Sequence, residues 1–406
     1  MKKKTVQFCA DNTLCCSCGF CADICPVNAI KIIENKYLFV PSVDLTKCIQ
    51  CGLCYDLCAG KGNDWLKNCA DIKSKQQIET FFTEDLGFHS DCYIAHSTDD
   101  ELRLHCASGG IVTTLLLYML RTKQIDGAIV TRFIPDNPLA VETIIATTEE
   151  EIIDAKSSKY CPVHMDGIIS QLKTFEGKVA FVGLPCQIQT LRKIEGKYKW
   201  LKEKIILHIG LYCSGGKDTR ALNYLLKKNG IPKDGIKKFA YRDDGCLGYV
   251  KATYESDNET KLVPFVQAYN KLHSYFKPER CVQCIDHFAY LADISIGDVD
   301  CEPYNKDTIG SNSVIIRTDV ADKVFKAALS NKAIEAETLA VSEVVRSQKI
   351  LPLRKSLFSS YTSLRKILSQ SIPEYDKLPS STRRFEGLKR LVLYLFQRNI
   401  CNLLIK

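Results

Sequence analysis

The sequence predicts a mixed α/β protein in which a largely parallel sheet is flanked by helices, with a small α+β domain in front of it. Apolar stretches alternate with amphipathic ones between residues 90 and 216, as they do in βαβ units. The chain holds 21 cysteines among 406 residues, and they are dense in the first 70, where long apolar segments are few. Hydrophobic residues make up 46% and charged residues 25%, which excludes global disorder and a collagen-like repeat.

The elements of the body follow from hydrophobic periodicity and from helix start signals. Gly110 precedes an apolar helix, and Thr148 with Glu151 forms a capping-box start for another. We expect helices over 110–121, from 148 onward, over 187–194 and over 218–228, and strands over 127–134, 141–146, 178–184, 205–213, 237–241, 249–254, 294–296 and 314–317. After Pro352, apolar and basic residues alternate at helical spacing over 383–404, which predicts an amphipathic terminal helix.

Length and composition divide the chain into four regions. At roughly 150 residues per domain, a chain of 406 residues predicts two or three domains. We expect a metal domain over 1–75 and the two parts of a catalytic body over 85–216 and 217–345, followed by a basic amphipathic tail over 346–406. Residues 351–406 of this tail hold 11 Lys and Arg against 3 Asp and Glu, which equals the whole net charge of +8, and nothing predicts nucleic-acid binding.

The cysteines suit a reducing compartment. Lys2, Lys3 and Lys4 are not followed by the apolar segment of a secretory signal. The longest clean apolar runs, 115–120 and 391–396, are far shorter than the roughly 18 to 20 residues of a membrane span. We therefore expect a cytoplasmic protein without a transmembrane span, in which clustered thiols bind metal rather than form disulfides.

The strongest signal is a repeated cysteine motif. Cys15, Cys18, Cys21 and Cys25 follow the pattern C-x2-C-x2-C-x3-C, and Cys48, Cys51, Cys54 and Cys58 repeat it 33 residues later. In such motifs the first three thiolates hold one 4Fe–4S cluster and the fourth binds the other cluster. One cluster then takes Cys15, Cys18, Cys21 and Cys58, and the other takes Cys48, Cys51, Cys54 and Cys25. The two motifs resemble the bacterial two-cluster ferredoxins over residues 9–70.

Two other metal chemistries fit this spacing poorly. Zinc needs four ligands, whereas the repeat offers eight in two threefold groups. A radical-generating C-x3-C-x2-C triad would need a cysteine where Asn28 and Lys61 stand. The missing proline after Cys58, where Ala59 stands, is a minor departure because proline is not a ligand.

Four cysteines of the body are candidate ligands of a third cluster. Cys186 and Cys213 stand at the ends of predicted strands, and Cys281 and Cys284 form a C-x2-C pair. Thiolates can converge at the strand ends of an α/β sheet. The alternative is that each is a buried apolar residue, which is how we interpret Cys9, Cys16, Cys69, Cys92, Cys106, Cys161, Cys246, Cys301 and Cys401.

Two turns of the body could hold a phosphate. Ser108, Gly109 and Gly110 precede an apolar helix, whose first backbone N–H groups favour an anion. The segment 156–160, Lys-Ser-Ser-Lys-Tyr, offers two cations and three hydroxyls. Each feature alone is a weak signal, because a Ser-Gly-Gly sequence is more often an ordinary turn, and no G-x-G-x-x-G or P-loop motif indicates a standard nucleotide site.

The order of these motifs resembles the coenzyme F420 hydrogenase/dehydrogenase beta-subunit family over residues 90–345. The resemblance rests on Cys-Ala-Ser-Gly-Gly (106–110), Lys-Ser-Ser-Lys-Tyr (156–160), Gly-Leu-Pro-Cys-Gln (183–187), Gly-Leu-Tyr-Cys-Ser-Gly (210–215), Lys-Pro-Glu-Arg-Cys-Val-Gln-Cys-Ile-Asp (277–286) and Ala-Asp-Ile-Ser-Ile-Gly-Asp (292–298). Members of that family bind FAD, carry an iron–sulfur cluster in the body, and move electrons between clusters and a hydride donor or acceptor.

The resemblance implies a third 4Fe–4S cluster on Cys186, Cys213, Cys281 and Cys284. It also assigns the phosphates and ribityl chain of FAD to the two turns, with Ser108, Gly109, Gly110, Ser158, Lys159 and Tyr160 as contacts. Cys161-Pro162 departs from the expected pattern after Tyr160. Asp293 and Asp298 lie in the last motif, and either could be structural.

These expectations describe an iron–sulfur flavoprotein oxidoreductase. Single electrons would pass through the clusters to FAD, which would reduce a small substrate by two electrons, with ferredoxin or another redox protein as partner. The alternatives are a coenzyme F420-dependent oxidoreductase and a non-catalytic electron-transfer protein within a larger redox complex. Catalytic residues and the substrate stay unassigned. The basic tail is a solvated helix, a docking site for an acidic partner, or a peripheral membrane contact.

Overall fold

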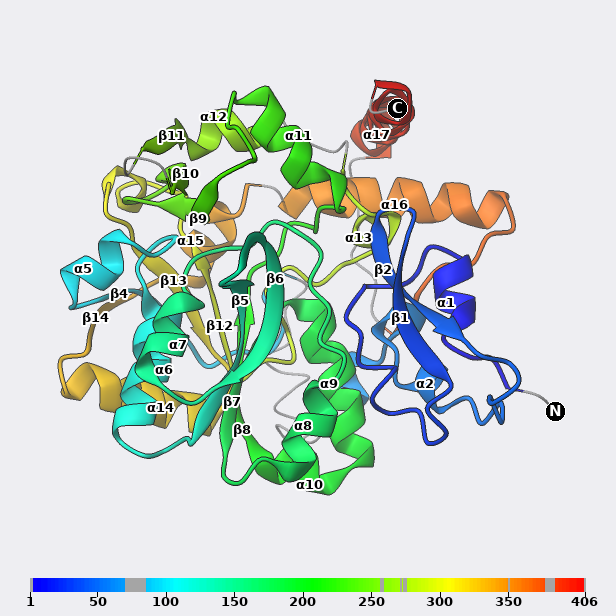
Figure 1. Ribbon diagram of the computed structural model, residues 1–406, viewed down its shortest axis with the longest axis horizontal. Coiled ribbons are helices and arrows are strands. Elements are labelled where there is room, and N and C mark those ends of the chain that lie inside the picture. The colour runs from blue at the N-terminus through cyan, green and yellow to red at the C-terminus, as the bar shows by residue number, and fades with distance from the viewer. Residues whose placement is uncertain are drawn as a thin grey trace.

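An eight-stranded sheet forms the centre of the body (Figure 1). The computed structural model describes residues 3–69, 85–255, 259–270, 272, 276–349, 351–376 and 384–404; residues 70–75 of the predicted metal domain lie outside them, as do residue 383 and the side chains of Cys69 and Cys401. The strands follow the order β14–β4–β13–β12–β8–β7–β5–β6. Their bounds are β4 Asp91–Ser97, β5 Gly127–Ile134, β6 Asn137–Ala146, β7 Val179–Gly183, β8 Ile205–Leu211, β12 Ile294–Asp298, β13 Asn312–Ile316 and β14 Ile334–Thr338.

Strand pairing in this sheet is parallel at the centre and antiparallel at both edges. The strands β12, β8, β7 and β5 pair in parallel, whereas β13, β4 and β14 on one side and β6 on the other pair antiparallel. The predicted α/β class is therefore confirmed. The carboxyl ends of β8 and β12 lie side by side, so Cys213, two residues after β8, and Asp298, the last residue of β12, stand at the same end of the sheet.

Helices cover both faces of the sheet. On one face lie α6 (Ile111–Arg121), α7 (Glu149–Asp154) and α14 (Asp319–Ser330), with the short α5 (Asp100–Leu104) at the rim. On the other face lie α8 (Ile168–Thr174), α9 (Pro185–Lys197), α10 (Lys199–Lys204) and α15 (Val341–Ser347). Successive side chains of β7 point to opposite faces of the sheet, so Val179 and Phe181 pack in the core on the second face and Ala180 packs in the core on the first.

Local signals explain where several elements begin. Helix α7 starts at the predicted capping box, in which the Glu151 amide donates to Thr148 Oγ1 at 3.3 Å and the Thr148 amide donates to Glu151 Oε2 at 3.4 Å. Helix α9 begins two residues before its predicted start, because Pro185 occupies its first turn. Strand β6 begins earlier than predicted, at Asn137, and its edge position tolerates Pro138.

A second, smaller antiparallel sheet lies beside the main one. Its strands are β9 (Ile236–Asp243), β10 (Tyr249–Tyr254) and β11 (Thr260–Pro264), in the order β11–β10–β9. Helices α11 (Arg220–Lys228) and α12 (Phe265–Asn270) pack against it around a separate apolar core. Residues 217–345 therefore contain this added unit as well as β12 to β14, which return to the main sheet.

The N-terminal domain consists of short elements joined by cysteine-bearing loops. A two-stranded sheet pairs β1 (Ile30–Asn35) with β2 (Leu38–Val43). Around it lie α1 (Gln7–Asp11), α2 (Leu53–Asp56), the 3₁₀ turn η1 (Ala59–Lys61), β3 (Gly62–Asn63) and α3 (Trp65–Cys69). Figure 1 shows this domain, in blue, docked against one side of the body.

The N-terminal domain shares a hydrophobic core with the body. Phe20 and Trp65 belong to the same buried cluster as Phe181 and Ile188, and the rings of Phe20 and Phe181 lie 6.3 Å apart. The Asp23 carboxylate accepts from the backbone amides of Gly167 and Ile169 at 2.8 and 3.0 Å. The first cysteine motif is thus fixed relative to α8 and α9.

The C-terminal segment closes the molecule over both parts. Helix α16 (Leu351–Ile367) runs from the body to the N-terminal domain, β15 (Glu374–Tyr375) pairs in parallel with β3, and α17 (Arg384–Leu404) packs on α16 (Figure 1). The short helix α13 (Glu279–Val282) lies against α16, and the 3₁₀ turn η2 (Tyr304–Lys306) follows β12. Within the described residues, no helix combines the length and apolar character needed to cross a bilayer.

Candidate functional site

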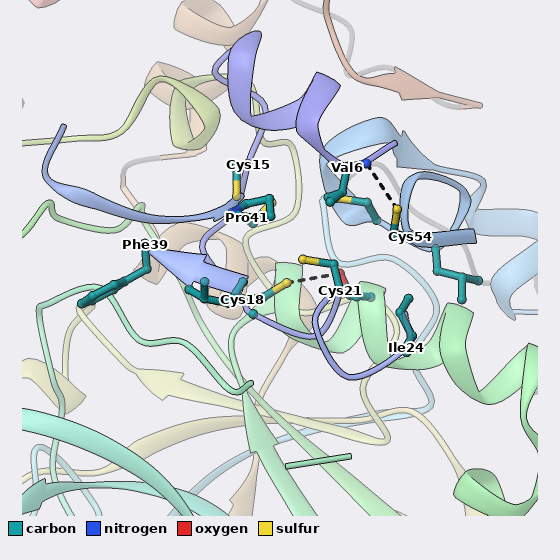
Figure 2. A pocket seen from close by; sticks show the side chains of 14 residues that line it. Val6, Cys15, Cys18, Cys21, Ile24, Phe39, Pro41 and Cys54 are labelled. Carbon is teal, nitrogen blue, oxygen red and sulfur yellow. Dashed lines mark hydrogen bonds between the residues drawn. The ribbon is translucent and has the colours of Figure 1, made fainter. Parts of the chain in front are cut away.

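The first cysteine set gathers in an apolar pocket of the N-terminal domain. Cys15, Cys18, Cys21 and Cys58 line this pocket, together with two further cysteines, Cys16 and Cys54, and apolar side chains such as Phe39 (Figure 2). Cys58 follows α2 and belongs to the second motif, so the fold brings the last thiol of one motif beside the first three of the other. These four are the residues that the spacing assigns to one cluster.

The second set lies nearer to the surface. Cys54 lies close to Cys25 and Cys51. Burial raises the pKa of Cys54, and these two neighbouring thiols raise it further. Cys51 is exposed and Cys48 is half-buried. This side of the N-terminal domain is therefore the one that a redox partner can approach.

Backbone amides point at the sulfur atoms of several candidate ligands. The amide of Val6 donates to Cys54 Sγ at 3.3 Å, that of Ala29 to Cys25 Sγ at 3.3 Å, and that of Gly60 to Cys58 Sγ at 3.2 Å. Such bonds stabilise a thiolate and are one of the means by which proteins tune cluster potentials. Within the described residues, no three cysteine sulfurs lie close enough to share a single metal ion. The donor set thus fits iron–sulfur clusters better than zinc.

The body cysteines form a third set. Cys186 lies in the first turn of α9, Cys213 follows β8, and Cys281 and Cys284 lie in and after α13. Cys186 lies close to Cys213 and Cys284, and Cys213 lies close to Cys281 and Cys284. Burial raises the pKa of Cys213 to about 11, and the two neighbouring thiols add to this shift. A bound metal would supply the positive charge that keeps such thiols deprotonated.

Positive side chains surround the third set without carboxylate partners. Arg354 donates to the carbonyls of Cys213, of Cys284 at 3.1 Å and of Asp286 at 3.2 Å, and Arg280 donates to the carbonyls of Ala59 and Gln283, each at 2.9 Å. Neither arginine forms an ion pair within the part of the chain that the structure describes. Burial opposes the charge of Arg354, but the thiolates of Cys284, Cys213 and Cys281 hold its pKa above the usual value. Cations placed in this way fit an anionic cluster.

The Ser-Gly-Gly turn is packed tightly between β4 and β13. A side chain at Gly109 would lie 2.7 Å from the Ala95 carbonyl oxygen, and Gly110 has a φ of +76°. The Ser108 hydroxyl donates to the Ser311 carbonyl at 2.7 Å, and Asn312 Oδ1 accepts from the Ile111 amide at 3.2 Å. Close packing therefore explains the two glycines, and the Ser108 hydroxyl is engaged within the protein.

The second predicted flavin segment carries a cation without a hydrogen-bonded carboxylate. Lys159 Nζ donates to the carbonyls of Ala155 at 2.5 Å and Lys156 at 2.8 Å. Burial lowers the pKa of Lys159 to about 7. Burial raises the pKa of Cys106, which precedes the Ser-Gly-Gly turn, and the nearby charges of Lys156 and Lys159 oppose this rise. The fold therefore brings the two segments together. The positive charge of Lys159 fits a phosphate group.

An aromatic side chain joins the third cysteine set to this segment. The rings of Tyr160 and Tyr269 lie 4.7 Å apart. Burial and Tyr160 raise the pKa of Tyr269, and the Cys213 thiol raises it further, so Tyr269 lies close to Cys213. Tyr160 also packs against Tyr241 and Phe265. The third set and the Ser158–Tyr160 segment are thus neighbours across one side chain.

The acids of the last motif serve two different networks. Asp293 is buried and bonds both His208 Nδ1, at 3.0 Å, and Arg192, at 2.9 Å, and Glu195 bonds His208 Nε2 at 2.6 Å. Asp298 accepts from Arg242 at 2.6 Å near the Ser158–Tyr160 segment. Asp293 therefore holds the core together, whereas Asp298 lies at the edge of the candidate flavin region.

Comparisons with known proteins match both parts of the chain. Residues 92–170 match the N-terminal model, and residues 176–342 the C-terminal model, of the family described as coenzyme F420 hydrogenase/dehydrogenase, beta subunit. The chain belongs to this beta-subunit family. Residues 14–61 match the 4Fe-4S dicluster domain, so this family member is an iron–sulfur oxidoreductase with a two-cluster domain in front.

Two relatives of this family member come from Methanosarcina barkeri and Methanocaldococcus jannaschii. The coenzyme F420 hydrogenase subunit beta of Methanosarcina barkeri is 26% identical over 289 residues, which are 67% of this chain and 94% of that protein. The coenzyme F420-dependent sulfite reductase of Methanocaldococcus jannaschii is 25% identical over 362 residues, which are 86% of this chain but only 50% of that protein. The chain thus spans half the length of the sulfite reductase.

One solved structure shows the same fold. It is the F420-reducing [NiFe] hydrogenase complex from Methanosarcina barkeri, of which one chain superposes with a TM-score of 0.52 at 24% identity. The match covers 70% of this chain and 93% of that one. The likeness is a likeness of fold.

Sequence reasoning missed two residues around the third set. Cys16 was expected to be a packing residue, but its thiol lies close to Cys186 and Arg280 and also lines the pocket of the first set. Arg354 was assigned to the tail and instead reaches the loop of Cys213. The doubled cysteine at 15 and 16 was a signal available in the sequence, whereas nothing in it marked Arg354.

Proposed function

We propose that this chain is an iron–sulfur flavoprotein oxidoreductase that joins one-electron and two-electron chemistry. When bound, 4Fe–4S clusters would carry single electrons, and FAD would exchange a hydride equivalent with a small substrate. The observation that carries the proposal is continuity. Cys54 of the second set lines the pocket of the first set, Cys16 next to Cys15 lies close to Cys186 of the third set, and Tyr269 connects the third set to Tyr160.

The protein's own residues have definite tasks in this proposal. The eight cysteines of the repeat would hold two clusters, and Cys186, Cys213, Cys281 and Cys284 would hold a third. Lys159 would pair with a flavin phosphate, Gly109 and Gly110 let the backbone turn at the start of α6, and the apolar lining of the first pocket excludes water. Asp298, which is partly exposed beside Arg242, is placed where it could hold or move a proton near the flavin.

Electrons would enter or leave through the second cysteine set. Cys51 is exposed, whereas Cys54 is buried, so this cluster would lie within reach of a redox partner. We expect the partner to be ferredoxin or another small redox protein in a reducing, cytoplasmic compartment, because exposed thiols persist there.

A second candidate is a coenzyme F420-linked reaction. The relatives favour it, because both the hydrogenase subunit and the sulfite reductase are named for coenzyme F420. In that case the body would exchange a hydride equivalent with F420 and pass single electrons outward through the N-terminal clusters.

Cofactor content after anaerobic purification tests the proposal. We expect about twelve iron and twelve sulfide per chain, with about one FAD released on denaturation. About eight iron without flavin would contradict the flavoprotein and leave a protein that only carries electrons. Reduction of the bound flavin by reduced ferredoxin, compared with reduction by F420H₂, then separates the two candidates.

The exposed face of α17 offers a surface contact. Phe385, Val392 and Phe396 are 84%, 60% and 62% exposed, and residues 351–406 carry the net charge of +8. Exposed apolar side chains in a basic segment fit the headgroup region of an anionic membrane. The proposal therefore includes peripheral binding of α17 to such a surface.

Vesicle sedimentation tests this contact. The full chain should sediment with vesicles of phosphatidylcholine containing phosphatidylglycerol, but not with phosphatidylcholine alone. The double variant Phe385→Ser/Phe396→Ser should lose this binding, whereas Phe358→Leu, a change in the buried face of α16, should keep it. Equal sedimentation of the wild type with both vesicle types, or none with either, would contradict a membrane contact and favour an acidic protein partner.

A further inference from the structure

One hydroxyl of the body lies in the pocket of the first cysteine set. Thr190 stands on α9, is 3% exposed, and lines this pocket together with Cys18. Its Oγ1 is hydrogen-bonded to Cys18 Sγ at 3.9 Å. The same hydroxyl donates to the carbonyl of Cys186, one turn earlier on α9, at 3.1 Å. A single side chain thus contacts a predicted ligand of the first cluster and the backbone of a predicted ligand of the third.

Helix α9 holds the neighbouring segment of the N-terminal domain in place. The amide of Ala59, which follows the predicted ligand Cys58, donates to Thr190 Oγ1 at 3.2 Å. One turn later on α9, Lys193 Nζ donates to the carbonyls of Cys58 at 3.1 Å and Gly62 at 2.6 Å. The position of Thr190 relative to the first set is therefore fixed by hydrogen bonds that cross between the two parts of the molecule.

The chemistry of the two groups decides which of them donates when iron is bound. A protonated Cys18 thiol donates to Thr190, whose hydroxyl has one proton to give and can accept two hydrogen bonds. A cysteine that binds iron is a thiolate without a proton, so this contact then requires the Thr190 hydroxyl as the donor. The Cys186 carbonyl keeps the Thr190 amide as its partner within the helix, and the Ala59 amide keeps its acceptor.

We propose that Thr190 is a positioning residue that donates a hydrogen bond to the Cys18 ligand of the first cluster and raises the potential of that cluster. This inference deepens the proposed function and rests on it only for the assignment of Cys18 as a ligand, because it requires neither FAD nor the third cluster. A hydrogen bond to a ligand sulfur stabilises the reduced, more negative cluster, so the potential becomes more positive. Docking on α9 thus makes the first cluster a better electron acceptor, which favours transfer from the exposed second cluster toward the body.

The test compares variants of the anaerobically purified full chain by iron analysis and by redox titration followed with electron paramagnetic resonance. Thr190→Val replaces the hydroxyl by a methyl group of similar size and should keep the iron content of the wild type. Reduction of its first cluster should be about tenfold less favourable, which is a shift of about 59 mV to more negative potential. Thr190→Ser, which keeps the hydroxyl, should return the potential toward the wild-type value.

Further variants assign the signals and control for general effects. Cys51→Ala and Cys284→Ala should remove the signals of the second and third clusters, respectively, and so identify the remaining signal as that of the first. Thr362 is buried on α16, and its hydroxyl donates to the carbonyl of Phe358, four residues earlier, at 2.8 Å, just as that of Thr190 does to Cys186. Thr362→Val should therefore leave all the potentials unchanged.

The outcomes separate this inference from the proposed function. A wild type with about eight iron and no flavin would contradict the flavoprotein but would leave this test in force, because both clusters of the repeat would be present. Far fewer than about eight iron would overturn both. In a wild type with at least about eight iron, an unchanged first-cluster potential in Thr190→Val, or an equal shift in Thr190→Val and Thr190→Ser, would overturn only the role of Thr190. Loss of iron from Thr190→Val alone would also overturn it, because the hydroxyl would then hold the cluster rather than set its potential.

Discussion

Lys159 is the residue on which anion binding in the flavin region depends. Its amine donates only to backbone carbonyls, and burial lowers its pKa to about 7. A bound phosphate would stabilise the charged form, so binding takes up a proton once the pH exceeds that value. For the wild type we expect the dissociation constant of FAD to rise by up to about tenfold per pH unit between pH 7 and 9.

Variants at this position check the expectation by fluorescence titration of the flavin-free protein. Lys159→Met should bind FAD at least about tenfold more weakly at pH 6.5 and should lose the pH dependence. Lys323→Met, in an exposed position on α14, should behave as the wild type does. A wild-type affinity that stays constant from pH 6.5 to 9 would show that the Lys159 charge does not contact the flavin.

Asp293 organises a buried charge network whose contribution depends on pH. Burial opposes charge throughout the network, but the two carboxylates hold the pKa of His208 above its ordinary value, and Arg192 and His208 hold the pKa of Asp293 below its own. The stabilisation from His208 is complete below its ordinary pKa of about 6.5 and is lost as the pH rises through the raised value. The stabilisation from Asp293 is lost only in acid.

We expect Asp293→Asn to lower the free energy of unfolding by about 3 kcal/mol near pH 6, because it leaves Arg192 and His208 with fewer partners. The difference from the wild type should shrink toward pH 9, where the imidazole is neutral in both proteins. Anaerobic thermal unfolding at pH 6, 7.5 and 9 measures it. Asp300→Asn, an exposed partner of Lys349, is the control, and an equal difference at all three pH values would mean that His208 is neutral throughout.

At the scale of elements, α16 fastens the N-terminal domain to the body. Arg365 donates to the Asn12 carbonyl at 2.9 Å, to Thr13 Oγ1 at 3.0 Å and to Glu279 Oε2 at 3.1 Å. Glu279 lies on α13, two residues before Cys281, and also accepts from Tyr361 on α16 at 2.8 Å. One buried arginine therefore links α1, α13 and α16.

Arg365→Met should loosen this junction. Loss of the charged hydrogen bonds should cost about 3 kcal/mol and increase amide hydrogen exchange over residues 7–13, with little change in the central strands. Lys366→Met, on the exposed side of the same turn, should leave exchange unchanged. If both variants exchange alike, the shared apolar core alone holds the domain in place.

Most elements of the body could be predicted from the sequence because their signals are local. The capping box at Thr148 located the start of α7, and the strand predicted over 249–254 coincides with β10. The separate sheet of β9 to β11 was not predicted, because pairing between strands depends on the tertiary fold rather than on periodicity.

The same distinction holds for the candidate site. The spacing of the repeat predicts that Cys58 joins Cys15, Cys18 and Cys21, and in the structure these four line one pocket, which Cys16 and Cys54 also line. Spacing could not distinguish Cys16 from a packing residue, because only the docking of the N-terminal domain on α9 brings it to Cys186. Arg354 was hidden for a similar reason, since its contact with the Cys213 loop spans 141 residues of sequence.

At the scale of the whole molecule, the buried cations near the cysteine sets affect the stability of the fold. Arg280 is buried and Arg354 is half-buried beside the third set, and the acceptors of both are mainly carbonyls. Lys193 likewise donates to the carbonyls of Cys58 and Gly62, and burial lowers its pKa to about 8. Without an anion nearby, such charges disfavour the folded state.

Removal of iron should therefore destabilise the chain beyond the loss of the metal–sulfur bonds themselves. We expect anaerobic treatment with a ferrous chelator under reducing conditions to lower the midpoint of thermal unfolding by more than about 10 °C.

In Arg354→Met the metal-bound form should be less stable than the wild type, because the carbonyls of Cys213, Cys284 and Asp286 lose their donor. The stability of the metal-free form should change less, because the substitution also removes an uncompensated positive charge. The gap in unfolding midpoint between the metal-bound and metal-free forms should therefore be smaller in Arg354→Met than in the wild type. Differential scanning calorimetry of all four samples measures this gap, with Lys355→Met, which removes a partly exposed ion pair with Asp85, as the control. An equal gap in the wild type and in Arg354→Met would show that the charge of Arg354 is balanced by something other than the cluster.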